Sequence, residues 1–120
     1  MNMRAWMEAW RDAPVKKSMP VLSFPSISLL GVTVQELIND SQLQAKGMKM
    51  IADRVDSAAA VSMMDLSVEA EAFGSAIRVS NDEVPTVIGS IVTTEQQARD
   101  LAVPPVGAAR TGKYIEALRL

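Results

Sequence analysis

A chain of 120 residues that is 48% hydrophobic and 22% charged, with a formal net charge of −2, fits one globular domain with a modest core. It has no cysteine and no histidine, which excludes disulfides, zinc–thiolate sites and imidazole bases within these residues. The 12 basic residues are scattered, so no nucleic-acid partner is expected. No apolar run approaches the roughly 20 residues that span a bilayer, and no signal-type apolar segment opens the chain. We therefore expect a cytoplasmic protein without a membrane segment.

The chain begins with a pattern typical of an amphipathic helix. Asn2 is placed to cap a helix that runs to about Asp12. Its larger apolar residues recur on one face, which we expect to be buried: Met3, Trp6, Met7 and Trp10. A strand is then predicted over residues 21–24, between two prolines, and a loop over residues 25–31.

Two helices are predicted next. Thr33 and Glu36 have the spacing of a capping box for the first, and Ser41 and Gln44 form a possible second box for a longer helix. Gly47 lies inside the longer helix, where glycine costs about 1 kcal/mol relative to alanine. Its presence indicates that another element packs closely there.

The stretch from residue 58 to residue 74 predicts a buried strand, an acidic residue at its end and a short helix. Residues 58–64 are apolar without alternation, as in a strand buried on both faces, and Asp65 follows at its carboxyl end. Ser67 is a possible N-cap for a short helix, with Glu69 and Glu71 in its first turns. Ligands bind at the carboxyl ends of parallel strands, so Asp65 is a candidate site residue. The alternative is a helix-terminal acid with no ligand.

Strand, helix and strand in this order form a βαβ unit, so we expect residues 21–24 and 58–64 to be adjacent parallel strands. A hairpin over 76–80 and 86–92, a short helix over 95–101 capped by Thr94 and Gln97, and a last helix over 111–120 complete the chain. A (β/α)8 barrel needs about 250 residues. The sequence therefore predicts an α/β fold, with residues 1–120 forming one domain that is the N-terminal part of a (β/α)8 TIM-type barrel.

Uncovered strand edges and helix faces favour association between copies. We expect a homo-oligomer whose contact buries Tyr114, Ile115 and Leu118.

The ordered motifs resemble the uroporphyrinogen decarboxylase superfamily, and within it the branch of corrinoid-dependent methyltransferases, such as the methylcobalamin:coenzyme M methyltransferases. The motifs are Pro20-Val21 at the first strand, Asp65 followed by the turn at Glu69–Gly74, Pro85 in the hairpin, and VPPVGAARTGKYIEAL at 103–118. In this resemblance the chain is the N-terminal portion of the barrel.

The resemblance implies an enzyme that moves a methyl group between a methylcorrinoid and a thiol or similar acceptor, with a corrinoid protein or free methylcorrinoid as partner. It implies ligand contacts at Asp65, Ser67 and Glu69, and no catalytic residue in this portion. It also implies a zinc held by His and Cys residues that lie further along the family's chain, since this chain has neither type.

Two other functions stay open. The decarboxylases follow the first strand with an arginine-rich segment, and the matching residues 24–31 contain no arginine, so porphyrinogen decarboxylation is disfavoured. The other function is that of a non-catalytic, truncated relative that associates with itself or with a partner.

Overall fold

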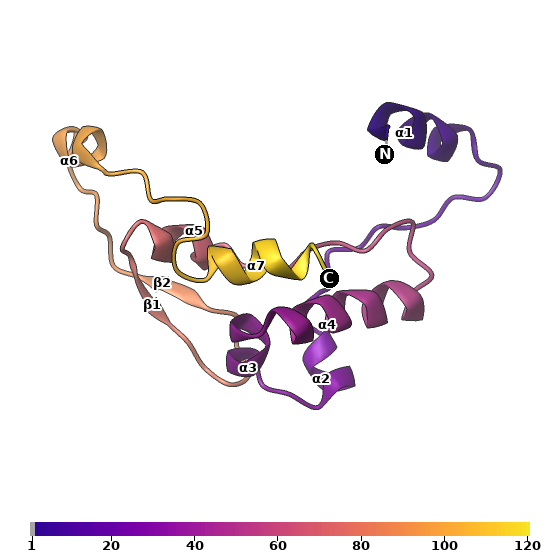
Figure 1. The fold of residues 1–120 in the computed structure, drawn as a ribbon, viewed down its shortest axis with the longest axis horizontal. Helices are drawn as coiled ribbons and strands as arrows, with labels where there is room; N and C mark the ends of the chain where they lie inside the picture. The colour runs from indigo at the N-terminus through magenta and orange to yellow at the C-terminus, as the bar shows by residue number, and fades with distance from the viewer. Residues whose placement is uncertain (1) are drawn as a thin grey trace.

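A computed structural model describes residues 2–120 of the chain (Figure 1). This part of the chain forms a mixed domain of short helices and a two-stranded sheet. In chain order its elements are α1 (Met3–Asp12), α2 (Ser26–Leu30), α3 (Val34–Asn39), α4 (Ser41–Arg54), α5 (Ser67–Ala72), β1 (Ala76–Arg78), β2 (Thr86–Ile88), α6 (Glu95–Asp100) and α7 (Thr111–Ala117).

Helix α4 is the centre of the packed part of the molecule. It contacts α2, α3 and α7, and α7 in turn contacts α5 (Figure 1). The buried apolar side chains come from these helices and from the segment before α5: Val34, Leu37, Ile38, Met48, Met63, Val68 and Ala117. We call α2, α3, α4, α5 and α7 the helical body.

Capping fixes where α3 and α4 begin. The Thr33 hydroxyl accepts a hydrogen bond from the Glu36 N–H (3.1 Å), and the Glu36 carboxylate accepts one from the Thr33 N–H (2.8 Å), which confirms the first predicted capping box. The second predicted box, at Ser41 and Gln44, is wrong. Asp40 caps α4 instead by accepting two first-turn N–H groups, and Ser41 lies inside the helix with its hydroxyl bonded to a glutamate of α7. A carboxylate one residue earlier outcompetes the hydroxyl, because its charge also favours the helix N-terminus.

Residues 25–31 are not the predicted loop, because α2 forms there. A five-residue helix is too short to show a 3.6-residue periodicity. Gly31, at φ +68°, ends it in the left-handed conformation. A Cβ on Gly47 would lie 2.5 Å from the Ser26 hydroxyl oxygen, so the missing side chain lets α2 cross α4 closely. The expected close neighbour at Gly47 is confirmed.

The two predicted strands, 21–24 and 58–64, do not form a sheet in the described residues: Phe24 lies in a turn, and Ala58 and Ala59 lie in a bend. The Ala58 N–H donates to the Ser18 carbonyl (2.8 Å), and the Ser23 hydroxyl donates to a carbonyl of the second segment (2.8 Å). The segments therefore run side by side in the same direction, as expected. The strand prediction itself is wrong, because a parallel ladder needs cover and further strands, and the proline that opens the first segment has no N–H.

The sheet is the predicted antiparallel hairpin, and β1 pairs with β2 in the register Ala76↔Ile88 and Arg78↔Thr86. Each strand has three residues, which is shorter than expected. The predicted capping box at Thr94 and Gln97 is confirmed at the start of α6, and the predicted last helix stops at residue 117.

Helix α1 stands apart from the helical body (Figure 1). None of its residues is buried, and Met7 is 62% exposed, so the predicted burial of this face is wrong. Trp6 and Trp10 contact each other edge to face, with ring centroids 6.2 Å apart. The helix itself is confirmed, because the Asn2 side chain accepts from the Ala5 N–H (3.2 Å) as its cap.

The described residues form an open shape measuring 52 × 36 × 22 Å. Their radius of gyration is 17.0 Å, whereas a compact domain of this length has about 14 Å. Their accessible surface is 8039 Å², against roughly 6,300 Å² for a compact monomer of this mass. None of the helices in residues 2–120 combines the length and the apolar character that a bilayer crossing requires.

Candidate functional site

Five polar side chains from three parts of the chain meet at the carboxyl end of the segment 58–65. Asp65 ends that segment, Ser67 and Glu71 come from α5, and Arg110 and Tyr114 come from the start of α7. We call these residues the Asp65 cluster. It joins positions that lie 39 to 49 residues apart in the sequence.

The Asp65 carboxylate accepts four hydrogen bonds. Its Oδ1 accepts from the Ser67 N–H (3.0 Å) and the Ser67 hydroxyl (2.6 Å). Its Oδ2 accepts from Arg110 Nη1 (2.5 Å) and from the Tyr114 hydroxyl (2.8 Å). A carboxylate has about four acceptor positions, so Asp65 is satisfied within the chain.

The Arg110 guanidinium binds three groups at once. Besides Asp65, its Nε donates to Glu71 Oε2 (2.5 Å) and its Nη2 donates to the Ser67 hydroxyl (2.9 Å). Arg110 is 7% exposed and Asp65 is 4% exposed, while Glu71 is partly exposed. An uncompensated charge this deep would be costly, so the pair depends on both partners being present.

The environment sets the charges of the cluster. Burial raises the pKa of Asp65, but the hydrogen bonds from Ser67, Tyr114 and Arg110 outweigh burial and leave this pKa below its ordinary value. Burial and the hydrogen bond to Asp65 raise the pKa of Tyr114. Burial lowers the pKa of Arg110, and its bonds to Asp65 and Glu71 raise it by more. Near neutral pH, Asp65 is ionised, Arg110 is charged and Tyr114 is a neutral donor.

A cavity of about 390 Å³ lies on one side of the cluster. Asp65, Glu69 and Tyr114 line it, whereas Ser67 and Arg110 do not. The rest of its lining is mostly apolar and includes Met63, Met64, Leu66, Val68, Ile115 and Leu118. Asp65 and Tyr114 are therefore the members of the cluster that border the cavity, whereas Ser67 and Arg110 lie outside its lining.

The structure brings two of the three predicted site residues together. Asp65 and Ser67 are bonded to each other, and Glu69 is exposed at the cavity. Ser67 is not the predicted N-cap of α5, because its hydroxyl bonds to Asp65 and Arg110 while Asp65 accepts the Ser67 N–H. The carboxylate is the stronger acceptor for that donor.

Sequence reasoning missed Arg110 and Tyr114 as members of the site. Tyr114 was interpreted as part of an apolar helix face, and Arg110 only as part of a family motif. One signal was available, because a buried Asp needs a cation or several donors. That signal does not say which of the chain's basic residues supplies the charge.

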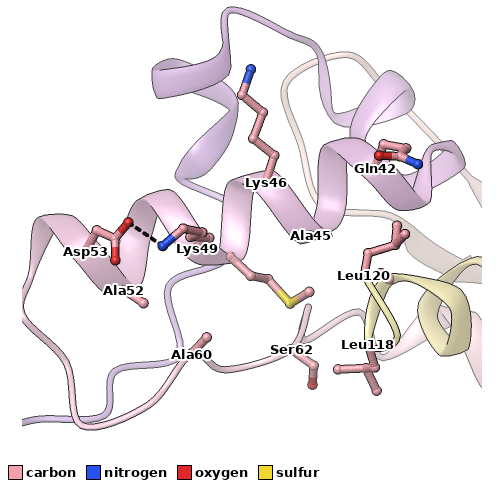
Figure 2. A pocket seen from close by; sticks show the side chains of 12 residues that line it. Gln42, Ala45, Lys46, Lys49, Ala52, Asp53, Ala60, Ser62, Leu118 and Leu120 are labelled. Carbon is pink, nitrogen blue, oxygen red and sulfur yellow. Dashed lines mark hydrogen bonds and ion pairs between the residues drawn. The ribbon is translucent and has the colours of Figure 1, made fainter.

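A larger cavity of about 680 Å³ lies between α4, the end of α7 and residues 60–62 (Figure 2). Its polar lining residues are Gln42, Lys46, Lys49, Asp53 and Ser62. Lys49 and Asp53 form a surface pair on one helix face, with Lys49 Nζ 3.0 Å from Asp53 Oδ2. Lys46 points away from it (Figure 2). Exposed pairs of this kind contribute roughly 0.3–0.5 kcal/mol, so this cavity carries no evident chemistry.

The residues present do not fit the zinc that the resemblance implies. Within residues 2–120, no group of three or more His, Cys, Asp or Glu side chains could hold a metal ion. The sequence has none of the imidazole or thiolate ligands that zinc prefers. The cavity at Asp65 is near the lower limit of ligand pockets, roughly 300–1,000 Å³, and is too small to enclose a corrin macrocycle.

The fold resembles that of a larger enzyme. A methyltransferase from Methanosarcina mazei matches with a TM-score of 0.71 and 20% sequence identity, over 98% of this chain and 37% of that chain. At this level of sequence identity the match shows a similar fold and nothing more. The chain spans little more than a third of the length of the matched protein. A comparison with curated proteins finds no match.

The sequence itself defines the family. The family model for uroporphyrinogen decarboxylase (URO-D) matches residues 20–120. The chain therefore belongs to the uroporphyrinogen decarboxylase family, which confirms the resemblance to this superfamily, and its fold is similar to part of the Methanosarcina mazei methyltransferase.

Proposed function

We propose that this chain forms part of a corrinoid-dependent methyltransferase, which moves a methyl group between a methylcorrinoid and a thiol or similar acceptor. Membership of the URO-D family and the fold of the matched methyltransferase support this function. The zinc ligands and most of the corrinoid site would come from outside the described residues. A cytoplasmic location stays a prediction.

The observation that carries the proposal is the lack of free positive charge at the site. Within residues 2–120, Arg110 is the one buried basic side chain, and Asp65 and Glu71 neutralise it. Helix α2, which stands where the decarboxylases carry arginines, has no basic residue. A substrate with several carboxylates would find no partner here, whereas a methyl group carries no carboxylate and needs none.

The three predicted site residues have different parts in this proposal. Asp65 lines the cavity, its Oδ2 is shared by Arg110 and Tyr114, and Ser67 donates to its Oδ1. Glu69 is the exposed carboxylate at the cavity and is free to turn toward a ligand. The corrinoid would supply the methyl group, and these residues would bind and orient one edge of the ligand.

The test is methyl transfer from methylcobalamin to a thiol with zinc present, followed by visible absorbance. It uses the longest polypeptide in which residues 1–120 are expressed, because these residues lack zinc ligands. Uroporphyrinogen is assayed in parallel. Demethylation above the protein-free control is expected, and decarboxylation without methyl transfer would contradict the proposal.

A second candidate function is a non-catalytic module that binds a second copy of itself. Its support is the accessible surface, which exceeds that of a compact monomer by about 1,700 Å². A homodimer that buried this excess on each copy would reach the size of obligate interfaces, roughly 2,000–5,000 Å² in total. Leu118 is 68% exposed and adjoins the half-buried Tyr114 and Ile115, as a contact surface requires.

Both tryptophans of the chain lie in α1, so their fluorescence reports on that helix alone. Light scattering at high concentration should show a dimer or larger assembly, and Leu118→Asp should weaken it by placing a charge in the contact. If α1 takes part, the emission should shift to the red on dilution. A monomer at high concentration would contradict this candidate.

A further inference from the structure

We propose that Arg110 is the positioning residue of this site: it fixes the orientation of the Asp65 carboxylate, so that Asp65 Oδ2 stays bonded to Tyr114 at the wall of the cavity. The inference rests on the proposed function only in that Asp65 is the group presented to a ligand. Arg110 does not line the cavity and acts through Asp65.

The guanidinium geometry carries the first step. Arg110 places three different nitrogens on three different acceptors, which are Asp65 Oδ2, Glu71 Oε2 and the Ser67 hydroxyl. The nitrogens are held in one rigid plane, so satisfying all three acceptors fixes where the Asp65 carboxylate lies. A lysine ammonium is a point charge and cannot set this plane.

The position of Arg110 in the chain carries the second step. It lies directly before α7, and Tyr114 follows four residues later on the same helix. Arg110 Nη1 and the Tyr114 hydroxyl therefore donate to the same oxygen, Asp65 Oδ2, and of these two residues only Tyr114 lines the cavity. A hydrogen-bond donor that entered the cavity would meet the Tyr114 contact and leave the Arg110 contact in place.

The charges around Asp65 carry the third step. The titratable groups near it are Glu69 and Glu71 on α5, and Arg110 and Tyr114 at α7. Arg110 is the one cation among them, and its hydrogen bond is one of those that keep the pKa of Asp65 low. Without Arg110, only the hydrogen bonds from Ser67 and Tyr114 would offset the burial of Asp65, so its pKa would rise.

The first measurement is a carbon NMR titration of the Asp65 carboxyl group in the expressed chain. In the wild-type protein its pKa should lie below the ordinary value of about 3.9. Arg110→Met should raise this pKa by at least about 1 unit, because a neighbouring opposite charge lowers a carboxyl pKa by roughly 1–3 units. Glu71→Gln, the matched control, removes the other carboxylate partner of Arg110 and should cause no rise. An unchanged pKa in Arg110→Met would overturn the proposal.

The second measurement separates orientation from charge. Arg110→Lys keeps the charge but loses the planar contacts. Tyr114 is the only tyrosine of the chain, so its ionisation is visible in ultraviolet absorbance. Its pKa should fall in Arg110→Lys, since the part of its rise that comes from the hydrogen bond to Asp65 is lost, while burial still raises it. An unchanged Tyr114 titration would overturn the positioning role.

Both variants are checked for folding by circular dichroism. If neither folds, the wild-type titration decides, because an Asp65 pKa at or above about 3.9 would by itself contradict the proposal. These measurements need no methyl transfer, so a negative assay for the proposed function would not affect them.

Discussion

Helices α1 and α4 both have an apolar face, but α4 packs against other helices and α1 does not. Helix α4 packs against α2, α3 and α7 and buries Met48 and Gly47. Helix α1 buries none of its residues, although its face carries both tryptophans of the chain. It also precedes residues 20–120, which the family model matches.

An apolar face therefore predicts a helix without saying what covers it. Burial of α4 depends on partners that the chain itself supplies within residues 2–120. Any partner of α1 would come from outside residues 2–120, as a second copy, another protein or another part of a longer fold. We expect mutations in the helical body to lower the free energy of unfolding strongly, and mutations in α1 to leave it nearly unchanged.

The largest loss is expected for Arg110→Met. Removing one partner of a buried ion pair leaves Asp65 uncompensated, which costs roughly 3–5 kcal/mol in the free energy of unfolding. The control is Arg119→Met, which makes the same change at an exposed position just after α7. Urea denaturation of both variants checks this, and a loss below about 1 kcal/mol would show that the pair is not what holds α7 to α5.

Leu37→Ala tests the apolar side of the helical body. Leu37 is fully buried in α3, and truncation of such a residue costs about 2–5 kcal/mol. Leu118→Ala at an exposed position should change the free energy of unfolding by less than about 0.5 kcal/mol at low protein concentration. Equal losses at the two positions would contradict the division between core and surface described above.

Gly47→Ala tests the close crossing of α2 over α4. The added Cβ would lie 2.5 Å from Ser26 Oγ and 2.9 Å from Ser26 Cβ, and overpacking of this kind costs about 1–3 kcal/mol. The better helix propensity of alanine offsets about 1 kcal/mol, so we expect a net loss near 1 kcal/mol.

Ser26→Gly in the same chain should restore part of that stability. It removes both contacting atoms, and within residues 2–120 the Ser26 hydroxyl has no hydrogen-bond partner to lose. A Gly47→Ala variant more stable than the wild type would show that α2 moves away without cost.

The smallest effect is expected for Trp6→Ala in α1. Because the helix buries nothing in the described residues, the free energy of unfolding measured at low concentration should change by less than about 0.5 kcal/mol. A loss above about 2 kcal/mol would show that α1 packs in solution, and the comparison with α4 would then fail.

Local signals predicted much of the fold. The boxes at Thr33 and Thr94, the cap at Asn2 and the hairpin are confirmed because each depends on neighbours within a few residues. The box at Ser41 failed because Asp40, one residue earlier, is the stronger cap. Helix α2 was missed because five residues carry too little periodicity.

The site was predicted only in part, because local patterns report on residues that are close in the sequence. Asp65 follows an apolar run and precedes a short helix, which is a local pattern, and Ser67 lies two residues away. Arg110 and Tyr114 lie 45 and 49 residues from Asp65, and no local pattern pairs them with it. The prediction of parallel strands failed for a further reason. A parallel ladder needs neighbouring strands to cover it, and nothing in residues 21–24 or 58–64 shows whether such strands are present.

The central claim is that Asp65 and Arg110 stabilise the helical body as a coupled pair. A double-mutant cycle of Asp65→Asn and Arg110→Met measures this coupling energy directly. Unfolding free energies of the wild type, both single variants and the double variant give the interaction energy. We expect at least about 1.5 kcal/mol, with the double variant more stable than the two single losses predict. Losses that add to within about 0.5 kcal/mol would show that the two residues act independently and would contradict the account.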